Sequence, residues 1–192
     1  MAGSARYTAV LDACVLYPAP LRDVLLSLGR AGLYHAKWTS QIHDEWVRSL
    51  RAQRPDIAED KLRRTREMMN SSIPDCLIEN YEALTDTIQL PDAGDRHVVA
   101  AAIIGHADAI ITFNLKDFPA SALSRYNIEA QHPDDFIVNQ LELHELAALT
   151  AIKEMRARLI KPVQSAAELI ATFERNQLTQ TAAWLKRAEK LI

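Results

Sequence analysis

The sequence predicts a three-layer α/β domain with a central parallel sheet, followed by C-terminal helices. Short β-prone runs alternate with helical segments over the first two thirds of the chain. The first run, YTAVL, is mostly apolar rather than alternating, which is typical of a central strand covered on both faces. After residue 136 the pattern is helical and carries no strand signal. The runs expected to form strands are residues 7–11, 34–38, 108–112 and 128–131.

The composition is that of an ordinary globular protein, with 48% hydrophobic and 24% charged residues in a chain of 192. The net charge of −3 gives no overall positive field, so a nucleic-acid partner would need a local basic patch or a bound cation. Two cysteines are too few for a disulfide framework and indicate a reducing cytoplasm. No apolar run approaches the roughly 18 to 20 residues of a transmembrane helix, and the first residues do not resemble a signal peptide. We therefore expect a cytoplasmic protein with no membrane partner.

The first strand ends on Asp12, at the carboxyl edge of the expected sheet. Pro18 and Pro20 then mark a turn and the start of a helix at residues 21–28, which Gly29 ends. A carboxylate directly after a parallel strand lies where open α/β sheets place their ligand sites. The alternative is that Asp12 only closes a turn.

The next helix, expected at residues 41–53, carries an acid beside its apolar stripe. Ile42 and Trp46 share this stripe, and Glu45 lies along its edge. Because an unpaired buried carboxylate is costly, this position suggests that a cation faces Glu45. The alternative is a rim residue that favours the helix N-terminus. The adjacent Asp44 points elsewhere on the helix, but the adjacency leaves open which of the two acids belongs to a site.

The middle of the chain has acids at both ends of one helix–strand unit. An apolar helix is expected at residues 98–105, before the strand at residues 108–112. Asp92 and Asp95 lie where this helix starts, and Asp117 follows the strand. Taken alone, Asp92 and Asp95 have an equally good interpretation as helix caps, each worth about 1 kcal/mol.

Residues 137–192 are expected to form a helical extension of a domain that covers residues 5–136. Pro162 and Ser165 separate a long first helix from a second, and a third follows from Thr179. Isolated helices of this length are marginal in water, so their apolar side chains must pack on the α/β domain or on a second copy of the chain. We expect no metal or catalytic site among these helices. The apolar residues include Leu146, Leu149, Ile152, Phe173, Trp184 and Leu185.

Four acids stand at strand ends or on helices that can face them: Asp12, Glu45, Asp95 and Asp117. Clustered carboxylates repel one another, so such a set is stable only when protons or cations neutralise it. Oxygen ligands select hard ions, Mg²⁺ or Mn²⁺, over zinc. The six histidines and two cysteines show no zinc-site spacing, and the five glycines form no phosphate-binding loop. The sequence therefore favours a magnesium or manganese site.

Four segments resemble those of PIN-domain proteins: VLDACVLYP, HDEW, DAGDRHVVAAAI and TFNLKDFP. The last two together are the more specific part. The resemblance covers about residues 7–136 and is closest to bacterial VapC-like toxins. It implies a PIN-like α/β/α fold with a parallel sheet, and cleavage of RNA with Mg²⁺ or Mn²⁺ held by four acids.

Carried over by position, the family's four acids fall on Asp12, Glu45, Asp95 and Asp117. The resemblance also implies a cognate antitoxin that occupies the site groove and, as is usual in the family, a homodimer. It says nothing about the purpose of the helices after about residue 139. Asp92 matches an extra acid of the family, and Thr112 and Asn114 match a polar pair that supports the site.

Three basic residues, Arg96, Lys116 and Lys37, are candidates to contact the phosphates that flank a scissile bond. For each of them an ordinary surface cation is the more common interpretation.

Two other functions stay open at this point. One is a non-catalytic binding module of the same fold, which is disfavoured because four idle carboxylates would only destabilise the core. The other is a phosphohydrolase that uses Asp12 as its nucleophile. Haloacid-dehalogenase-type enzymes of that class need a second Asp two residues later, and this position is Cys14.

Overall fold

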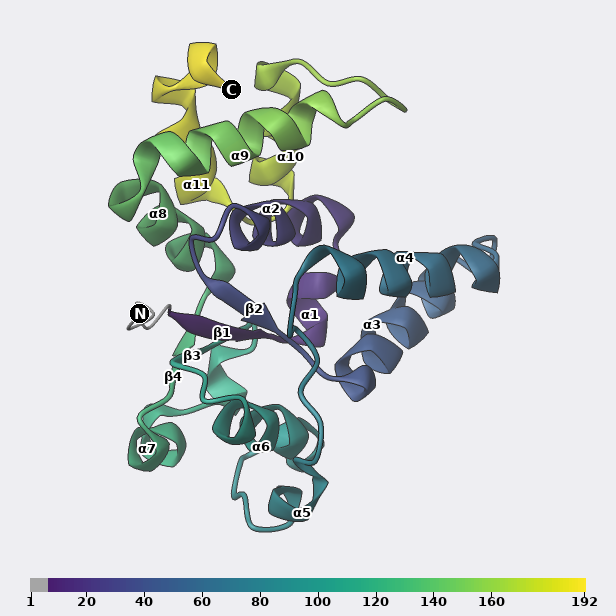
Figure 1. Cartoon of the computed structure of the whole chain (residues 1–192), viewed down its shortest axis with the longest axis vertical. Coiled ribbons are helices and arrows are strands. Elements are labelled where there is room, and N and C mark those ends of the chain that lie inside the picture. Colours follow the sequence, from purple (N-terminus) through teal and green to yellow (C-terminus); the bar gives the residue numbers. More distant parts are fainter. Residues whose placement is uncertain (1–6) are drawn as a thin grey trace.

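A computed structural model describes residues 7–192 and has a four-stranded parallel sheet at its centre (Figure 1). The expected domain start at residue 5 and the expectation about a signal peptide lie outside the described residues. The strand order is β2-β1-β3-β4. The chain adds β2 on one side of β1 and then adds β3 and β4 on the other side, so the topological switch point of the sheet lies between β1 and β3. The strands are β1 (Thr8–Leu11), β2 (His35–Lys37), β3 (Ala109–Ile111) and β4 (Glu129–Gln131).

The two central strands are buried on both faces, as their apolar sequences predict. Every residue of β1 and β3 is buried, whereas β4 forms a partly exposed edge. β1 pairs with β3 through the register Val10 to Ile110, and Thr112 therefore follows β3 beside Asp12. The expected parallel α/β sheet is confirmed.

Helices cover both faces of the sheet, as in a three-layer fold. In Figure 1, α2 and α8 lie on one side with the C-terminal helices beyond them, and α5 and α6 lie on the other. The N-terminal helices are α1 (Ala13–Leu16), α2 (Ala19–Arg30), α3 (Ser40–Gln53), α4 (Glu59–Ser72), α5 (Glu82–Thr85), α6 (Arg96–Ile104) and α7 (Ala120–Leu123). The C-terminal helices are α8 (Pro133–Leu143), α9 (Glu145–Ala157), α10 (Ala166–Arg175) and α11 (Thr179–Arg187). Short 3₁₀ turns are η1 (Ala93–Asp95), η2 (Leu115–Asp117), η3 (Ser124–Tyr126) and η4 (Glu189–Leu191).

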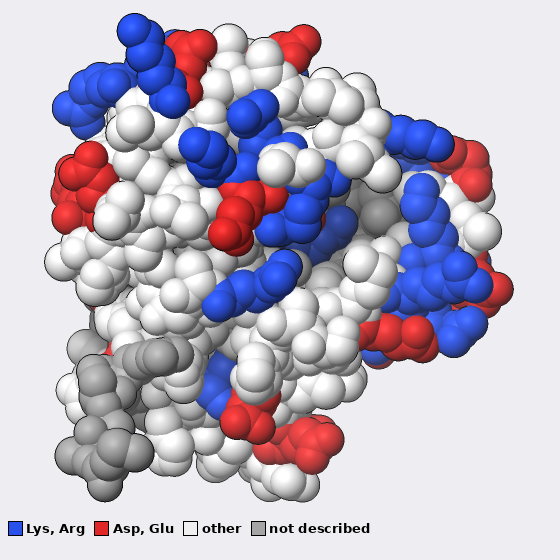
Figure 2. Space-filling model, turned by 45° about the horizontal axis from the view of Figure 1, so that its top comes forward, with Lys and Arg blue, Asp and Glu red and all other residues white. Residues whose placement is uncertain are grey.

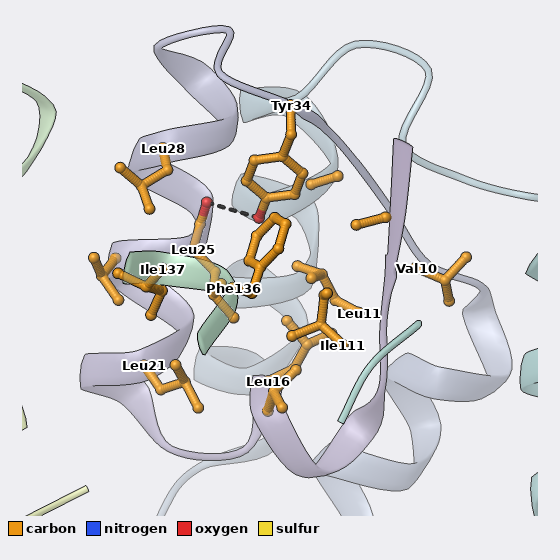
Figure 3. Packing of buried hydrophobic residues seen from close by; sticks show 14 of the residues in the cluster. Val10, Leu11, Leu16, Leu21, Leu25, Leu28, Tyr34, Ile111, Phe136 and Ile137 are labelled. Atoms are coloured by element: carbon orange, nitrogen blue, oxygen red, sulfur yellow. Dashed lines mark hydrogen bonds between the residues drawn. The ribbon is translucent and has the colours of Figure 1, made fainter. Parts of the chain in front are cut away.

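The core between α2, α8 and the sheet is closed by two aromatic rings (Figure 3). Tyr34 and Phe136 meet edge to face, with ring centroids 4.8 Å apart. The buried Tyr34 hydroxyl donates to the Leu25 carbonyl at 3.0 Å, which satisfies its one polar group. Leu21 and Leu28 of α2 complete this side of the core.

The helix α6 ends where its backbone passes close to the segment before α5. A Cβ on Gly105 would lie 2.6 Å from the Ile78 side chain, so only glycine fits without a shift of that residue. The C-terminal end of α6 therefore packs directly against Ile78.

The C-terminal helices pack on the α/β part of the same chain. Phe173 and Leu185 are fully buried, and Arg158 donates to the Ser27 hydroxyl of α2 at 2.9 Å. The expected long first helix is wrong, because His144 leaves helical geometry and divides it into α8 and α9. Leu146 was expected to pack, yet it is 82% exposed, because it lies on the outer side of the first turn of α9.

A buried carboxylate ties the last helix to α8. Asp134 is 2% exposed and accepts hydrogen bonds from the backbone N–H groups of Gln180 and Thr181, both at 2.8 Å. It thus caps α11 from a distance, where the helix dipole favours a negative charge. The expected division after residue 136 falls inside α8, and separate domains stay a prediction.

Across residues 7–192, every helix is too short or too polar to meet the requirements of a membrane-spanning segment.

Removal of this cap should loosen the C-terminal helices. We expect Asp134→Ala to lower the free energy of unfolding by about 2 kcal/mol, because two backbone donors lose their acceptor. Urea unfolding followed by circular dichroism measures this, with Glu142→Ala on the exposed side of the same helix as the control. Equal stability of the two variants would show that Asp134 does not hold α11.

Candidate active site

Asp12 lies at the carboxyl edge of the sheet, between β1 and α1, and is only 5% exposed. Its Oδ1 accepts from the Ala13 N–H at 2.6 Å, which caps α1. Its Oδ2 accepts from the Thr112 hydroxyl at 2.7 Å. Because Thr112 follows the neighbouring strand β3, this bond joins the carboxyl ends of both central strands. The alternative that Asp12 closes a turn accounts for the first bond and leaves the second unexplained.

Cys14 completes this network, and sequence reasoning gave it no role in the site. Its thiol donates to Asp12 Oδ2 at 3.1 Å, and its sulfur accepts from the Phe113 N–H at 3.3 Å. Burial, and then the charge of Asp12, raises the pKa of Cys14 to about 12. Cys14 is therefore a thiol at neutral pH and is not suited to act as a nucleophile or a metal ligand.

Thr112 and Asn114, the expected supporting pair, are joined to Asp12 by a chain of two hydrogen bonds. Thr112 Oγ1 accepts from the Asn114 N–H at 3.0 Å while it donates to Asp12. This orients the hydroxyl toward the carboxylate and shapes the turn that leads to Asp117.

Asp92 and Asp95 differ in whether their side chains cap a helix. Asp92 is exposed and accepts from the Gly94 N–H at 2.8 Å, which is the capping role. Asp95 begins α6 without a side-chain capping bond. Burial, and then the charges of Asp12, Asp92 and Asp117, raises the pKa of Asp95 to about 6. The capping interpretation thus holds for Asp92 and fails for Asp95.

We call Asp12, Asp92, Asp95 and Asp117 the acidic edge. The fold brings them together from β1, from the start of α6 and from η2, so that the other three act electrostatically on Asp95. This is a concentration of negative charge at the switch point of a parallel sheet, where α/β proteins bind ligands.

Glu45 lies on α3 and contacts His97 of α6. Its Oε1 lies 2.9 Å from His97 Nε2, and Gln41 donates to it at 3.3 Å. Asp44 instead pairs with Arg66 of α4 at 2.6 Å, on the surface. Of the two adjacent acids, the structure turns Glu45 toward the helix that carries Asp95, as the apolar stripe indicated. His97 and Gln41 were missed by sequence reasoning.

The acids fit a hard cation by their chemistry. Their oxygens are the ligands that Mg²⁺ and Mn²⁺ prefer, and a cation would relieve the repulsion that raises the pKa of Asp95. Within residues 7–192, no group of three or more His, Cys, Asp or Glu side chains is arranged to hold a metal ion.

The three basic residues expected to contact phosphates differ in their hydrogen-bond partners and in their exposure. Lys37 donates to the Asp75 carbonyl at 3.1 Å, and Lys116 is exposed in η2. Arg96 Nε is buried and has no hydrogen-bond partner among the described residues. Their contact with RNA stays a prediction.

Basic side chains gather on one face despite the net negative charge, as the blue atoms in Figure 2 show. A hollow of about 250 Å³ between α2, α4 and α9 is lined in part by Arg22, Arg30 and Arg158. On α4, Arg63 is paired with Asp60 and Glu67, as expected of a solvated helix face.

Comparison with known proteins places the chain. A family model described as the PIN domain matches residues 8–116, which is more than half of the sequence. The chain belongs to the PIN-domain family. The expected resemblance and the PIN-like α/β/α fold are thereby confirmed. A second family model, described as the VapC50 C-terminal domain, matches residues 133–187.

One curated relative, the "putative ribonuclease VapC50" of Mycobacterium tuberculosis, is 43% identical to this PIN-family chain over 93 residues. The match covers 48% of this chain and 54% of the relative, so the chain spans about half the length of the protein it matches. No solved structure matches the chain.

The raised pKa of Asp95 predicts a dependence of stability on pH. Because folded Asp95 keeps its proton up to about pH 6, the free energy of unfolding contributed by this group falls as the pH rises from its ordinary pKa to about 6. We expect Asp95→Asn to stabilise the protein by about 1 kcal/mol near pH 7.5 at low salt, a figure discounted for solvent screening, and to leave it unchanged near pH 4.

Urea unfolding at the two pH values measures this difference, and Asp44→Asn serves as a surface control. A loss of stability in Asp95→Asn near pH 7.5 would contradict the repulsion inferred for the acidic edge.

Proposed function

We propose that the chain is a metal-dependent endoribonuclease that hydrolyses RNA phosphodiester bonds and serves as the toxin of a toxin–antitoxin pair. The observation that carries this proposal is the acidic edge, in which three carboxylates act on Asp95 beside the switch point of the sheet. Membership of the PIN-domain family and the similarity to a relative named as a ribonuclease support it.

Asp12, Glu45, Asp95 and Asp117 are the residues proposed to hold Mg²⁺ or Mn²⁺. The ion supplies an activated water and stabilises the added negative charge on the phosphate oxygens. Asp12 is fixed before binding, because Ala13, Cys14 and Thr112 donate to its two oxygens.

Asp95 differs from Asp12 because its carboxylate is not used as a cap, so it is free to turn toward a ligand. Asp117, with Asp95, would accept a hydrogen bond from the attacking water and so orient it. Arg96, Lys116 and Lys37 are proposed to contact the flanking phosphates, each by its positive charge.

A protein inhibitor is proposed as the partner, since a free ribonuclease would damage its own cell. The negative charge of the acidic edge fits an inhibitor that inserts an Arg side chain, whose guanidinium pairs well with carboxylates. The homodimer implied by the family resemblance stays a prediction.

The other two functions are less well supported. A phosphohydrolase of the haloacid-dehalogenase type needs a second Asp two residues after Asp12, and this position holds Cys14, whose thiol donates to Asp12 Oδ2. A binding module without catalysis would gain nothing from the ionised Asp95, whose environment disfavours its charge.

Cleavage of a labelled single-stranded RNA tests the proposal. The wild-type chain should cleave in Mn²⁺ or Mg²⁺ and stop when EDTA is added. Asp12→Asn should lower the rate by at least about 100-fold, because a charge that faces the ion is lost. The matched control is Asp44→Asn, a surface acid paired with Arg66, which should cleave at the wild-type rate.

Circular dichroism shows whether each variant is folded. Full activity of a folded Asp12→Asn protein, or cleavage that persists in EDTA, would refute the proposed site. RNA binding without cleavage by the wild-type chain would favour the binding module.

A further inference from the structure

Glu45 is held in place by protein donors, and the strongest is a buried histidine. His97 Nε2 lies 2.9 Å from Glu45 Oε1, and the His97 side chain is 4% exposed against 28% for Glu45. The second donor, Gln41, is more distant at 3.3 Å and lies on the exposed side of α3. The orientation of the Glu45 carboxylate therefore depends mainly on His97.

His97 also lies beside the acidic edge. It belongs to the first turn of α6, two residues after Asp95. The contact with Glu45 therefore connects α3 to the first turn of α6, the helix that follows Asp95.

A histidine at this position is costly for packing alone. The five residues that follow it, Val98 to Ala102, are all buried and apolar. The His97 Nδ1 atom is buried and has no hydrogen-bond partner among the described residues, which is unfavourable for folding. The contact that offsets this cost is the one between Nε2 and Glu45, and an apolar side chain would pack as well without it.

We propose that His97 is a positioning residue that fixes the carboxylate of Glu45 for metal binding. The inference rests on the proposed function, in which Glu45 is a metal ligand. The Nε2–H group donates to one carboxylate oxygen, sets the rotamer of Glu45, and leaves the other oxygen free for the ion. Partners of metal ligands commonly act in this way, and their loss lowers metal affinity by about 10- to 100-fold.

Two amide substitutions separate this role from packing. Gln places its amide nitrogen near the position of the histidine Nε2, whereas the shorter Asn places it near Nδ1. His97→Gln should therefore keep the bond to Glu45, and His97→Asn should lose it, although both bury one neutral amide. The readout is the dissociation constant for Mn²⁺, measured by electron paramagnetic resonance on the full chain, with melting temperature measured in parallel.

We expect Mn²⁺ affinity to fall by about 10-fold or more in His97→Asn and by less than about 3-fold in His97→Gln. In a Glu45→Ala background, His97→Asn should cause no further loss, because its effect passes through Glu45. Equal affinities of the two folded single variants, or an undiminished effect of His97→Asn without Glu45, would overturn the proposal.

Failure of the proposed function gives a different result. If the wild-type chain does not bind Mn²⁺, Glu45 is not a metal ligand and the proposed function fails. The melting temperatures of His97→Asn, Glu45→Ala and the double variant then still test whether His97 and Glu45 interact. The proposal for His97 would also be overturned if wild type binds Mn²⁺ and Glu45→Ala binds it equally well.

Discussion

Electrostatic repulsion among carboxylates at the carboxyl edge of the sheet is the constraint on which the rest of the site depends. β1 and β3 are adjacent and parallel, so the residues that follow them must emerge side by side. The fold places Asp12 after one strand and Asp117 beyond the other, and the start of α6 adds Asp95. Burial and the neighbouring charges make ionised Asp95 unfavourable, and this cost has a function only if a cation joins the cluster.

Hydrogen bonds from surrounding residues stabilise several of these carboxylates. Donors from Ala13, Thr112 and Cys14 satisfy Asp12, and the Gly94 N–H satisfies Asp92. His97 engages Glu45 from the same helix that Asp95 begins. Asp95 makes no side-chain capping bond, and burial and the neighbouring carboxylates disfavour its charge, so a cation bound at this edge would stabilise it.

The sheet and the grouping of the acids were predictable because they follow from local patterns. Apolar runs such as residues 7–11 mark buried strands, and an acid after such a run must lie at the carboxyl edge. The apolar stripe of α3 favoured Glu45 over Asp44, and the structure pairs Asp44 with Arg66 on the surface. Tertiary contacts were not predictable in this way: the break at His144 has no glycine or proline, and the contacts of Asp134 with α11 and of His97 with Glu45 join residues far apart in sequence. The metal-ligand role of the acids stays a prediction.

The most direct test of the central claim is anomalous diffraction from crystals of the full chain soaked in Mn²⁺. The account predicts an anomalous peak at the carboxyl edge of the sheet, contacted by oxygens of Asp12, Asp95 and Asp117, with Glu45 turned toward it. No peak at this edge in saturating Mn²⁺, with these carboxylates still apart, would contradict the account.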